Sequence, residues 1–460
     1  MHFKRTPFAI EPYLQLGRTG RVEDMEIVWG TVEPVAKWQV ESRVEGGEWS
    51  APLEVSDPTR INVGGVDPFS LFHARVPGGV PGDGKRWAYR VLQDGKLVFE
   101  APGTPLHSQG DAFRFAVIGD TASGTIGQKA IATALWQVCK PEMLLIAGDI
   151  VYMHGRLSEY LNFYFPIFNA DRVSPNGVPM ARSTMFVGAP GNHDTDRGAI
   201  GKSSELELFP DGLAYYELFR QPMDGPDLKY PGNNVPRISG SDLQVESFIR
   251  AAGGSFPREG NFSYDYGNAH FVILDANLYM NWLDPALRDW LDNDLKKAAG
   301  KTWRFVMFHQ PPFNSDLHHY NEQQMRLVAD IFQRNHVDVV FSGHVHNYQR
   351  TRPLKFEVVE QSKGADFPDD RMVHGKLEMD MKYDGALNTK ADGVIYVITG
   401  CGGASLVEAA TPDYTNHVEE YTVKMFPLFS YTQVDVHGKS VVVQQIDPAG
   451  KVLDKFEITK

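Results

Sequence analysis

The sequence predicts a mixed α/β protein, in which a mostly parallel sheet flanked by helices follows a small all-β domain. Two observations predict this fold class. From about residue 112 onward, apolar strands alternate with helical segments, a pattern typical of parallel sheets. Before that point, short runs of alternating apolar and polar residues lie between turn clusters, which is typical of an antiparallel sandwich.

Length and composition limit the possibilities. The chain has 460 residues, of which 42% are hydrophobic, and this is ample for a folded core. At about 150 residues per domain, the length predicts two or three domains, or one large domain with an appendage. With 45 Lys and Arg against 58 Asp and Glu, the net charge is −13, so we expect neither a nucleic-acid partner nor binding to an anionic membrane surface.

The sequence contains few signals of cellular location or of disulfide chemistry. No window approaches the roughly 18 uninterrupted apolar residues of a membrane span, so none is expected. The N-terminus has no apolar run of signal-peptide length, so either the protein stays in the cytoplasm or a leader has been removed. The two cysteines, Cys139 and Cys401, are expected to be inert thiols rather than a disulfide or a reactive pair.

Residues 1–108 are interpreted as the small sandwich. Its expected strands include MEIVWGT, KWQVESR, RWAYRVLQ and KLVFEA, and the Asp94-Gly95 pair between the last two predicts a hairpin. Residues 101–111 are rich in Pro, Gly and Ser, as in a linker. The predicted domains are therefore 1–108 and 109–460.

In the second domain, the runs FRFAVIGD, EMLLIAGD, WRFVMFHQ and VDVVFSGH predict strands. Helices are expected over 125–138, from Asp284-Pro285 to about residue 299, and over 321–336. The stretch from residue 431 onward alternates with period two, so it is expected to extend the sheet with antiparallel strands. Residues 199–260 and 354–392 are polar and rich in Gly and Pro, which predicts long loops.

Five short segments place possible metal ligands at the ends of predicted strands. They are VIGDTASG, LLIAGDIVY, GAPGNHD, FVMFHQPP and VVFSGHVHNYQR. In that order they carry Asp120; Asp149 and Tyr152; Asn192, His193 and Asp194; His309; and His344 and His346. Side chains at the carboxyl ends of strands in an open α/β sheet meet at one edge. Any one of these residues alone could be an ordinary turn or core residue, but five such segments in order favour a shared site. Carboxylates can bridge two ions, and imidazoles bind Zn²⁺, Fe or Mn²⁺.

This set of motifs resembles the purple acid phosphatase branch of the calcineurin-like metallophosphoesterases, over roughly residues 112–350. The matching motifs are GD ending at 120, GDxxY at 149–152, GNHD at 191–194, VxxH at 306–309 and GHxH at 343–346. The resemblance implies a four-layer α/β/β/α sandwich for the catalytic domain. Residues 1–108, with PYLQ and MEIVWGT, resemble the fibronectin type III-like N-terminal domain of larger relatives.

The same resemblance implies two metal ions. Fe(III) is expected at Asp120, Asp149, Tyr152 and His346, and Zn, Mn or Fe(II) at Asp149, Asn192, His309 and His344, with Asp149 bridging. His193, together with His318, His319 and Glu322 in FNSDLHHYNE, is expected to contact substrate; the alternative for the His318-His319 pair is a solvated polar loop. Two departures from the family pattern are Ala122 in place of a glycine and NYQR in place of AYER. His154 and His270 are expected to be structural.

The expected activity is that of an acid phosphatase, which hydrolyses small-molecule phosphate monoesters by in-line attack of a metal-bound hydroxide. His193 would neutralise charge, and His319 would protonate the leaving group. One alternative is a phosphodiesterase or a nucleotide or inositol-phosphate hydrolase with the same centre. Another is a surface-binding protein with a vestigial phosphoesterase half. The resemblance points to a secreted or periplasmic enzyme although no leader is visible, and the oligomeric state is left open.

Overall fold

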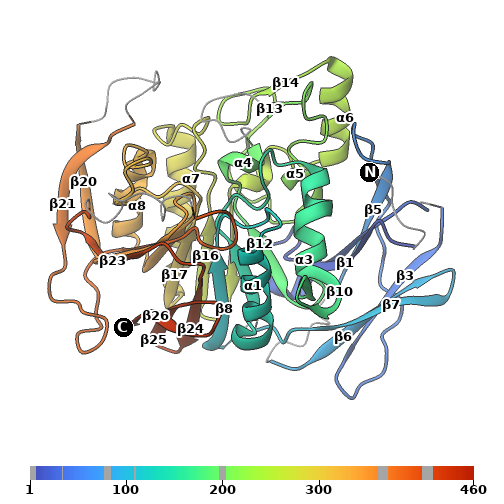
Figure 1. Cartoon of the computed structure of the whole chain (residues 1–460), viewed down its shortest axis with the longest axis horizontal. Coiled ribbons are helices and arrows are strands. Elements are labelled where there is room, and N and C mark those ends of the chain that lie inside the picture. Colours follow the sequence, from blue (N-terminus) through green and yellow to red (C-terminus); the bar gives the residue numbers. More distant parts are fainter. Residues whose placement is uncertain are drawn as a thin grey trace.

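The computed structural model describes residues 7–33, 35–76, 84–107, 110–195, 204–360, 371–406 and 418–460. Two large sheets lie face to face in the middle of the molecule, and helices cover their outer faces (Figure 1). The layers therefore run helix, sheet, sheet, helix, which confirms the predicted mixed α/β class and its four-layer arrangement.

The first sheet has ten strands in the order β26-β25-β24-β8-β9-β12-β1-β2-β5-β4. Its parallel centre consists of β8 (Ala112–Ile118), β9 (Met143–Ile146) and β12 (Met185–Gly188). The C-terminal strands β24 (Tyr431–His437), β25 (Ser440–Ile446) and β26 (Val452–Thr459) extend it in antiparallel fashion, as predicted.

The second sheet has seven strands in the order β15-β16-β17-β18-β22-β19-β23. The strands β16 (Ala269–Ile273), β17 (Trp303–Met307), β18 (Val339–Ser342) and β22 (Ile395–Thr399) are parallel to one another. The antiparallel edges are β15 (Phe262–Tyr266), β19 (Tyr348–Thr351) and β23 (Thr422–Phe426).

In the central strands apolar residues occupy consecutive positions, because both faces of these strands are buried. In β8, Phe115 and Val117 face the second sheet, whereas Ala116 and Ile118 belong to the core under the outer helices. Between the sheets, the Phe115 ring lies 5.2 Å from both the Phe271 and Phe305 rings, measured between centroids. This aromatic packing holds the two sheets at a fixed separation.

The predicted helices cover the outer faces. Helix α1 (Ile126–Ala134) begins at its N-cap Thr125 and continues as a wider turn over Leu135–Cys139, and α7 (Pro285–Lys297) begins at its N-cap Asp284. The predicted helix over 321–336 consists of a 3-10 segment, Gln324–Val328, followed by α8 (Ala329–Arg334). The remaining helices are α2 (Leu157–Glu159), α3 (Phe165–Phe168), α4 (Asn192–Thr195), α5 (Tyr215–Leu218) and α6 (Asp242–Ala252).

The N-terminal strands form the expected small β-sandwich region. One of its sheets is β3 (Trp38–Val44), β6 (Trp87–Gln93) and β7 (Lys96–Gly103), with the predicted Asp94-Gly95 hairpin between β6 and β7. The others, β1 (Ile10–Gln15), β2 (Glu26–Thr31), β4 (Thr59–Ile61) and β5 (Phe69–Arg75), are hydrogen-bonded into the ten-stranded sheet. The predicted boundary at 108/109 lies outside the described residues, so the division into 1–108 and 109–460 stays a prediction.

Two segments predicted as long loops contain regular structure. Within 199–260, α6 begins with a capping box formed by Ser241 and Gln244 and buries Phe248, Ala251 and Ala252 against its neighbours. Within 354–392, β20 (Leu354–Glu360) pairs with β21 (His374–Met379) as an antiparallel hairpin. Two further short pairs are β10 (Asn169–Ser174) with β11 (Gly177–Pro179) and β13 (Ser204–Glu205) with β14 (Ile238–Ser239). Helix α6 is polar in sequence because only one of its faces is buried, and β21 is polar because none of its residues is buried.

Both cysteines are free and buried, which confirms that they form no disulfide. Burial raises the pKa of the Cys401 thiol to about 11. Such a thiol stays protonated and unreactive at neutral pH. Among the described helices, none has the length and apolar character needed to cross a membrane.

His270 is structural, as expected. Its Nδ1 lies 2.8 Å from Oδ1 of Asp265, and its Nε2 lies 2.9 Å from Oδ2 of Asp294, so the imidazole joins the β15–β16 hairpin to α7. Burial lowers the pKa of His270, but the hydrogen bonds to the two carboxylates outweigh it and raise the pKa to about 9. The protonated ring therefore stabilises the fold.

We predict that His270→Gln destabilises the protein by about 3 kcal/mol near pH 6, because a raised pKa is worth about 1.4 kcal/mol per unit. The stabilisation is complete below the unfolded pKa of 6.5 and is lost as the pH rises through about 9. Urea unfolding at about pH 6 and about pH 10 measures the difference. The exposed His437→Gln serves as a control; an equal loss at both pH values in His270→Gln would contradict the charged pair.

Candidate metal centre

The predicted ligands all follow the carboxyl ends of adjacent strands. In the ten-stranded sheet, Asp120 follows β8, Asp149 follows β9 and Asn192 lies beyond β12. In the seven-stranded sheet, His309 follows β17 and His344 follows β18. The two sheets thus present their ligands at one common edge, as expected for side chains after parallel strands.

Glycines before the ligands allow the two sheets to approach closely. A Cβ atom on Gly148 would lie 2.4 Å from Nδ1 of His309, and one on Gly343 would lie 2.6 Å from the carbonyl oxygen of Ala147. Neither position has room for a side chain. The ligand Asp149 itself has φ +47°, in the left-handed region that ordinary residues seldom occupy. The Gly-Asp and Gly-His pairs are therefore steric requirements of the converging loops.

One half of the site is centred on Tyr152. Its Oη lies 2.8 Å from Oδ1 of Asp120 and 3.1 Å from Oδ2 of Asp149. The same oxygen lies 3.0 Å from Nε2 of His346. Four of the expected ligands, Asp120, Asp149, Tyr152 and His346, therefore meet around one point.

The other half is centred on His309. Its Nε2 lies 3.1 Å from Oδ1 of Asn192 and 3.2 Å from Oδ2 of Asp149. Nδ1 of His344 lies 3.3 Å from the same nitrogen. Because the Asp149 oxygen contacts both Tyr152 and His309, this carboxylate joins the two halves.

Backbone carbonyls and a carboxylate orient the imidazoles by hydrogen bonds to the ring nitrogen that points away from the site. A carbonyl oxygen can only accept a hydrogen bond, so Nδ1 of His309 donates to Ala147 at 2.8 Å, and Nδ1 of His346 donates to Ser405 at 2.7 Å. Both rings consequently turn Nε2 into the site. His344 is reversed, because its Nε2 lies 2.5 Å from Oε2 of Glu322 and its Nδ1 faces the site. Such partners hold metal-binding histidines in one tautomer.

The buried acidic groups of the site are suited to binding a cation. Burial, with Asp120 and Asp149 beside it, raises the pKa of Tyr152 well above its usual value. Burial lowers the pKa of His309, but Asp149 outweighs it and raises the pKa to about 10. Of the groups beside the buried carboxylates, Tyr152 is therefore a neutral phenol, and His309 carries a balancing positive charge. Hard carboxylate and phenol oxygens with imidazole nitrogens are also donors that suit transition-metal ions, which would replace the protons of Tyr152 and His309.

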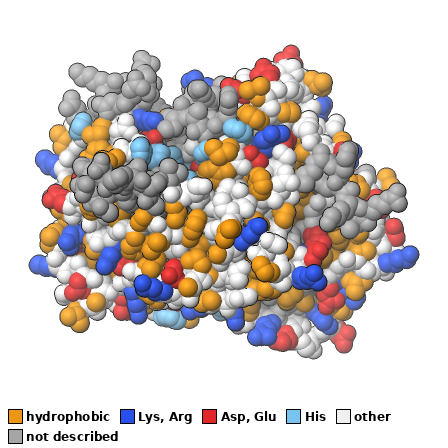
Figure 2. Space-filling view, in the orientation of Figure 1, with side chains coloured by type: hydrophobic (Ala, Val, Ile, Leu, Met, Phe, Trp, Pro, Cys, Tyr) orange, Lys and Arg blue, Asp and Glu red, His pale blue; other side chains and the backbone are white. Residues whose placement is uncertain are grey.

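The predicted substrate residues occupy different places. Nδ1 of His193 donates to the carbonyl of Met153 at 2.8 Å, which leaves its Nε2 3.9 Å from Oδ2 of Asp149. The His319 ring lies 4.3 Å from the His344 ring. His318 is exposed, and its side chain makes no hydrogen bond or ion pair with any residue that the structure describes. Figure 2 shows histidine side chains (pale blue) reaching the surface in the upper half of that view.

Two buried acidic residues have roles that the sequence analysis missed. Asp194, the last residue of GNHD, accepts hydrogen bonds from the backbone N–H groups of Gly191 and Ile150 and so braces the loops that carry Asn192 and Asp149. Burial, and then Asp149, raises the pKa of Asp194 to about 8. Glu322, expected to contact substrate, lies behind His344 and 3.1 Å from Nη1 of Arg371. The position of Asp194 within GNHD could have indicated that it belongs to the site. Nothing in the sequence around Glu322 indicates that it pairs with His344.

Comparison with known proteins identifies relatives. The calcineurin-like phosphoesterase family matches residues 113–348. Acid phosphatase type 7 of Mus musculus is 24% identical over 264 residues, which cover 51% of this chain and 53% of the relative. The chain thus spans about half the length of this curated relative. Probable inactive purple acid phosphatase 1 of Arabidopsis thaliana is 21% identical over 100% of this chain and 70% of its own length.

Solved structures share the fold. Purple acid phosphatase PPD1 from yellow lupin (Lupinus luteus) seeds superposes with a TM-score of 0.69 at 16% identity, covering 99% of this chain and 75% of that one. A structure of PhoD superposes with a TM-score of 0.57 at 13% identity, covering 100% of this chain and 92% of that one. Together with the family match, these similarities confirm the resemblance read from the motifs.

We predict that Glu322→Gln lowers the metal affinity of the site by about tenfold to a hundredfold, because His344 loses its charged partner. Competition with a chromophoric chelator measures this affinity. The exposed Glu246→Gln on α6 is the matched control. Unchanged metal affinity with a raised KM would contradict the positioning role and favour the substrate contact expected from the sequence.

Proposed function

Because the chain belongs to the calcineurin-like phosphoesterase family, we propose that it hydrolyses phosphate esters at a centre of two metal ions. The observation that carries this proposal is the position of Asp149. One of its oxygens lies 3.1 Å from the Tyr152 hydroxyl and 3.2 Å from Nε2 of His309, so a single carboxylate belongs to two adjoining sets of ligands. Carboxylates are the side chains that bridge paired ions in such centres.

Each set has donors for one ion. Asp120, Tyr152 and His346 would hold the first ion, and Asn192, His309 and His344 the second, with Asp149 contributing to both. Fe(III) suits the first set, which is rich in carboxylate and phenol oxygens, and Zn, Mn or Fe(II) suits the second set with its two imidazoles. When bound, such ions activate water and neutralise charge on phosphoryl oxygens.

Histidines at the edge of the centre would bind and protonate the substrate. Because Nδ1–H of His193 donates to the Met153 carbonyl, its Nε2 faces the centre, where the protonated ring would donate a hydrogen bond to a phosphoryl oxygen. His319 lies beside His344, with its Nδ1 3.5 Å from Oε1 of Glu322, a carboxylate that favours the protonated ring. That proton would go to the leaving alcohol. His318 would contact the substrate from the rim.

The relatives favour a phosphate monoester as substrate, since several are named acid phosphatases. The relative that aligns with the whole chain is named probable inactive, so the proposed activity depends on the ligands themselves. All seven expected ligands are present here and converge. The competing activities are hydrolysis of diesters, nucleotides or inositol phosphates at the same centre.

The proposal is tested by hydrolysis of p-nitrophenyl phosphate and bis(p-nitrophenyl) phosphate in parallel. We predict that the metal-loaded protein prefers the monoester and that Asp149→Ala loses at least about a thousandfold in kcat/KM together with its metal, because both ion sites share this carboxylate. Elemental analysis should find two ions per chain in the wild type. Tyr152→Phe should remain folded and lose any visible tyrosinate–Fe(III) absorption.

The exposed Asp384→Ala is the control for the loss of one carboxylate and should retain metal and activity. Preference for the diester would replace the monoester assignment. Tightly bound metal without turnover of either ester would contradict the enzyme and favour the surface-binding alternative.

The role of His319 as a proton donor predicts a dependence on the leaving group. His319→Ala should slow the hydrolysis of alkyl phosphates by about a hundredfold but that of p-nitrophenyl phosphate much less, because nitrophenolate leaves without protonation. Steady-state kinetics on both esters measure the difference. His318→Ala is the neighbouring control, and an equal loss on both esters in His319→Ala would exclude proton donation.

A further inference from the structure

A basic pocket lies at the end of the seven-stranded sheet that is opposite the metal centre. It has a volume of about 860 Å³ and opens where β17, β18 and β22 begin, whereas the metal ligands follow the ends of β17 and β18. The C-terminal residue Lys460 lines this pocket, and Figure 1 shows the C-terminus at the lower left of the molecule. The pocket shares no residue with the metal centre.

Cationic side chains from separate segments of the chain converge on this pocket. Those that line it are Lys301, Arg304, Lys355, Lys390, Lys439 and Lys460, together with His336, and the acidic residues that line it are Asp338 and Asp392. Six Lys and Arg against two Asp is a local excess of positive charge in a chain whose net charge is −13. Such clustering costs repulsion energy unless an anion binds there.

Several of these cations have acidic partners. Nζ of Lys460 lies 2.9 Å from Asp338, and Nζ of Lys355 lies 2.6 Å from Asp392. Nζ of Lys301 lies 3.1 Å from Asp265. The two aspartates of the pocket are therefore already neutralised by lysines.

The other three cations are less fully paired, although Asp338 also attracts the charge of Arg304. Lys390 and Lys439 are exposed and form no ion pair with any part of the chain that the structure describes. Arg304 is only 7% exposed; one Nη donates to the carbonyl of Ala298, but its Nε has no hydrogen-bond partner among the described residues. A buried guanidinium N–H without a partner is costly, so an anion that accepts hydrogen bonds from this guanidinium would be stabilised there.

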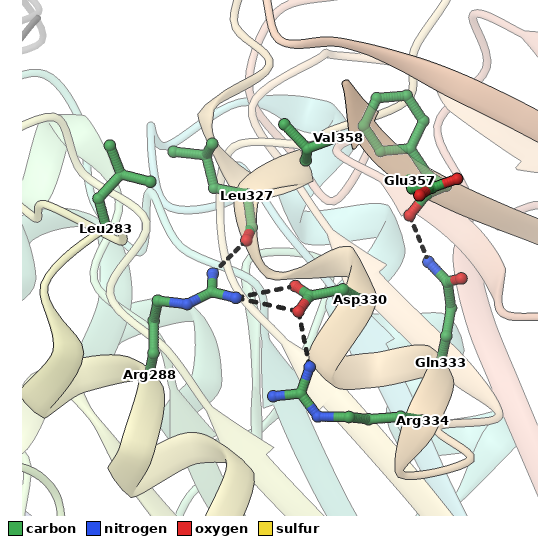
Figure 3. Close-up of a pocket in the computed structure, with 9 residues that line it drawn as sticks. Leu283, Arg288, Leu327, Asp330, Gln333, Arg334, Glu357 and Val358 are labelled. Carbon is green, nitrogen blue, oxygen red and sulfur yellow. Dashed lines mark hydrogen bonds and ion pairs between the residues drawn. The ribbon is translucent and has the colours of Figure 1, made fainter. Parts of the chain in front are cut away.

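A second pocket provides a contrast. Between α7, α8 and β20, the guanidinium of Arg288 lies 3.0–3.1 Å from both oxygens of Asp330, and Arg334 contacts the same carboxylate at 2.6 Å (Figure 3). Those cations are satisfied within the protein. The basic pocket differs because, among the described residues, the Nε–H of its buried arginine donates to no partner and two of its lysines form no ion pair.

We propose that the basic pocket binds a small anion that carries phosphate groups. A guanidinium with neighbouring ammonium groups is the usual protein site for phosphate, because each N–H donates to an oxygen of the anion. A small ligand fits better than an extended polyanion, since the protein as a whole is acidic and repels the latter. The proposal does not depend on the proposed hydrolysis.

The test is calorimetric titration of the metal-loaded protein with methylenediphosphonate, whose P–C–P linkage cannot be hydrolysed. We expect two binding events, one at the metal centre and one at the basic pocket. The double variant Lys390→Gln/Lys439→Gln should weaken the second event by about tenfold or more. The matched control, Lys382→Gln/Lys451→Gln, removes two exposed lysines outside the pocket and should retain both events.

Hydrolysis of p-nitrophenyl phosphate should be unchanged in both double variants, because neither alters the metal centre. If the metal centre fails to bind the anion, the event at the basic pocket remains and is still lost in Lys390→Gln/Lys439→Gln. Wild-type binding in that variant, or an equal loss in the control, would overturn the proposal. If duplex DNA binds the wild type more tightly than methylenediphosphonate does, and Lys390→Gln/Lys439→Gln loses that binding, the ligand of the basic pocket is a polymeric anion instead of a small one.

Discussion

The shared Asp149 carboxylate is the contact on which the rest of the site depends. It comes from the ten-stranded sheet and contacts His309 of the seven-stranded sheet at 3.2 Å, so the site exists only while the two sheets stay in register. The aromatic core between the sheets, including Phe115 and Phe305, maintains that register. Packing far from the ligands therefore controls the geometry of the ligands themselves.

Burying the polar groups that converge at the metal centre is tolerated because the carboxylates, the phenol and the imidazoles there have defined partners. Tyr152 donates to Asp120 and Asp149, while carbonyl oxygens hold the far nitrogens of His309 and His346. Buried charges without such partners would cost several kcal/mol each. The raised pKa values keep Tyr152 a neutral phenol and His309 a positively charged imidazolium, so the binding of metal ions would be coupled to the release of both protons.

The two ends of the seven-stranded sheet have opposite electrostatic character. At the carboxyl ends of the strands, carboxylates and imidazoles surround a place for cations. At the amino ends, Arg304, Lys390 and Lys439 surround a place for an anion. Both sites arise where strands begin or end, because loops there bring together residues that are far apart in the sequence. The sheet itself separates the two sites.

The sequence by itself determined the central strands and the helices α1 and α7, because apolar periodicity and N-caps are local signals. The seven expected ligands were indicated by the resemblance of their motifs to a known family. Only the tertiary structure decided that Glu322 supports His344, that α6 and the β20–β21 hairpin form in polar segments, and that Arg304 meets Lys390 and Lys439. These features depend on contacts between distant segments. Their cause is burial and charge in three dimensions, which the spacing of residues along the chain does not encode.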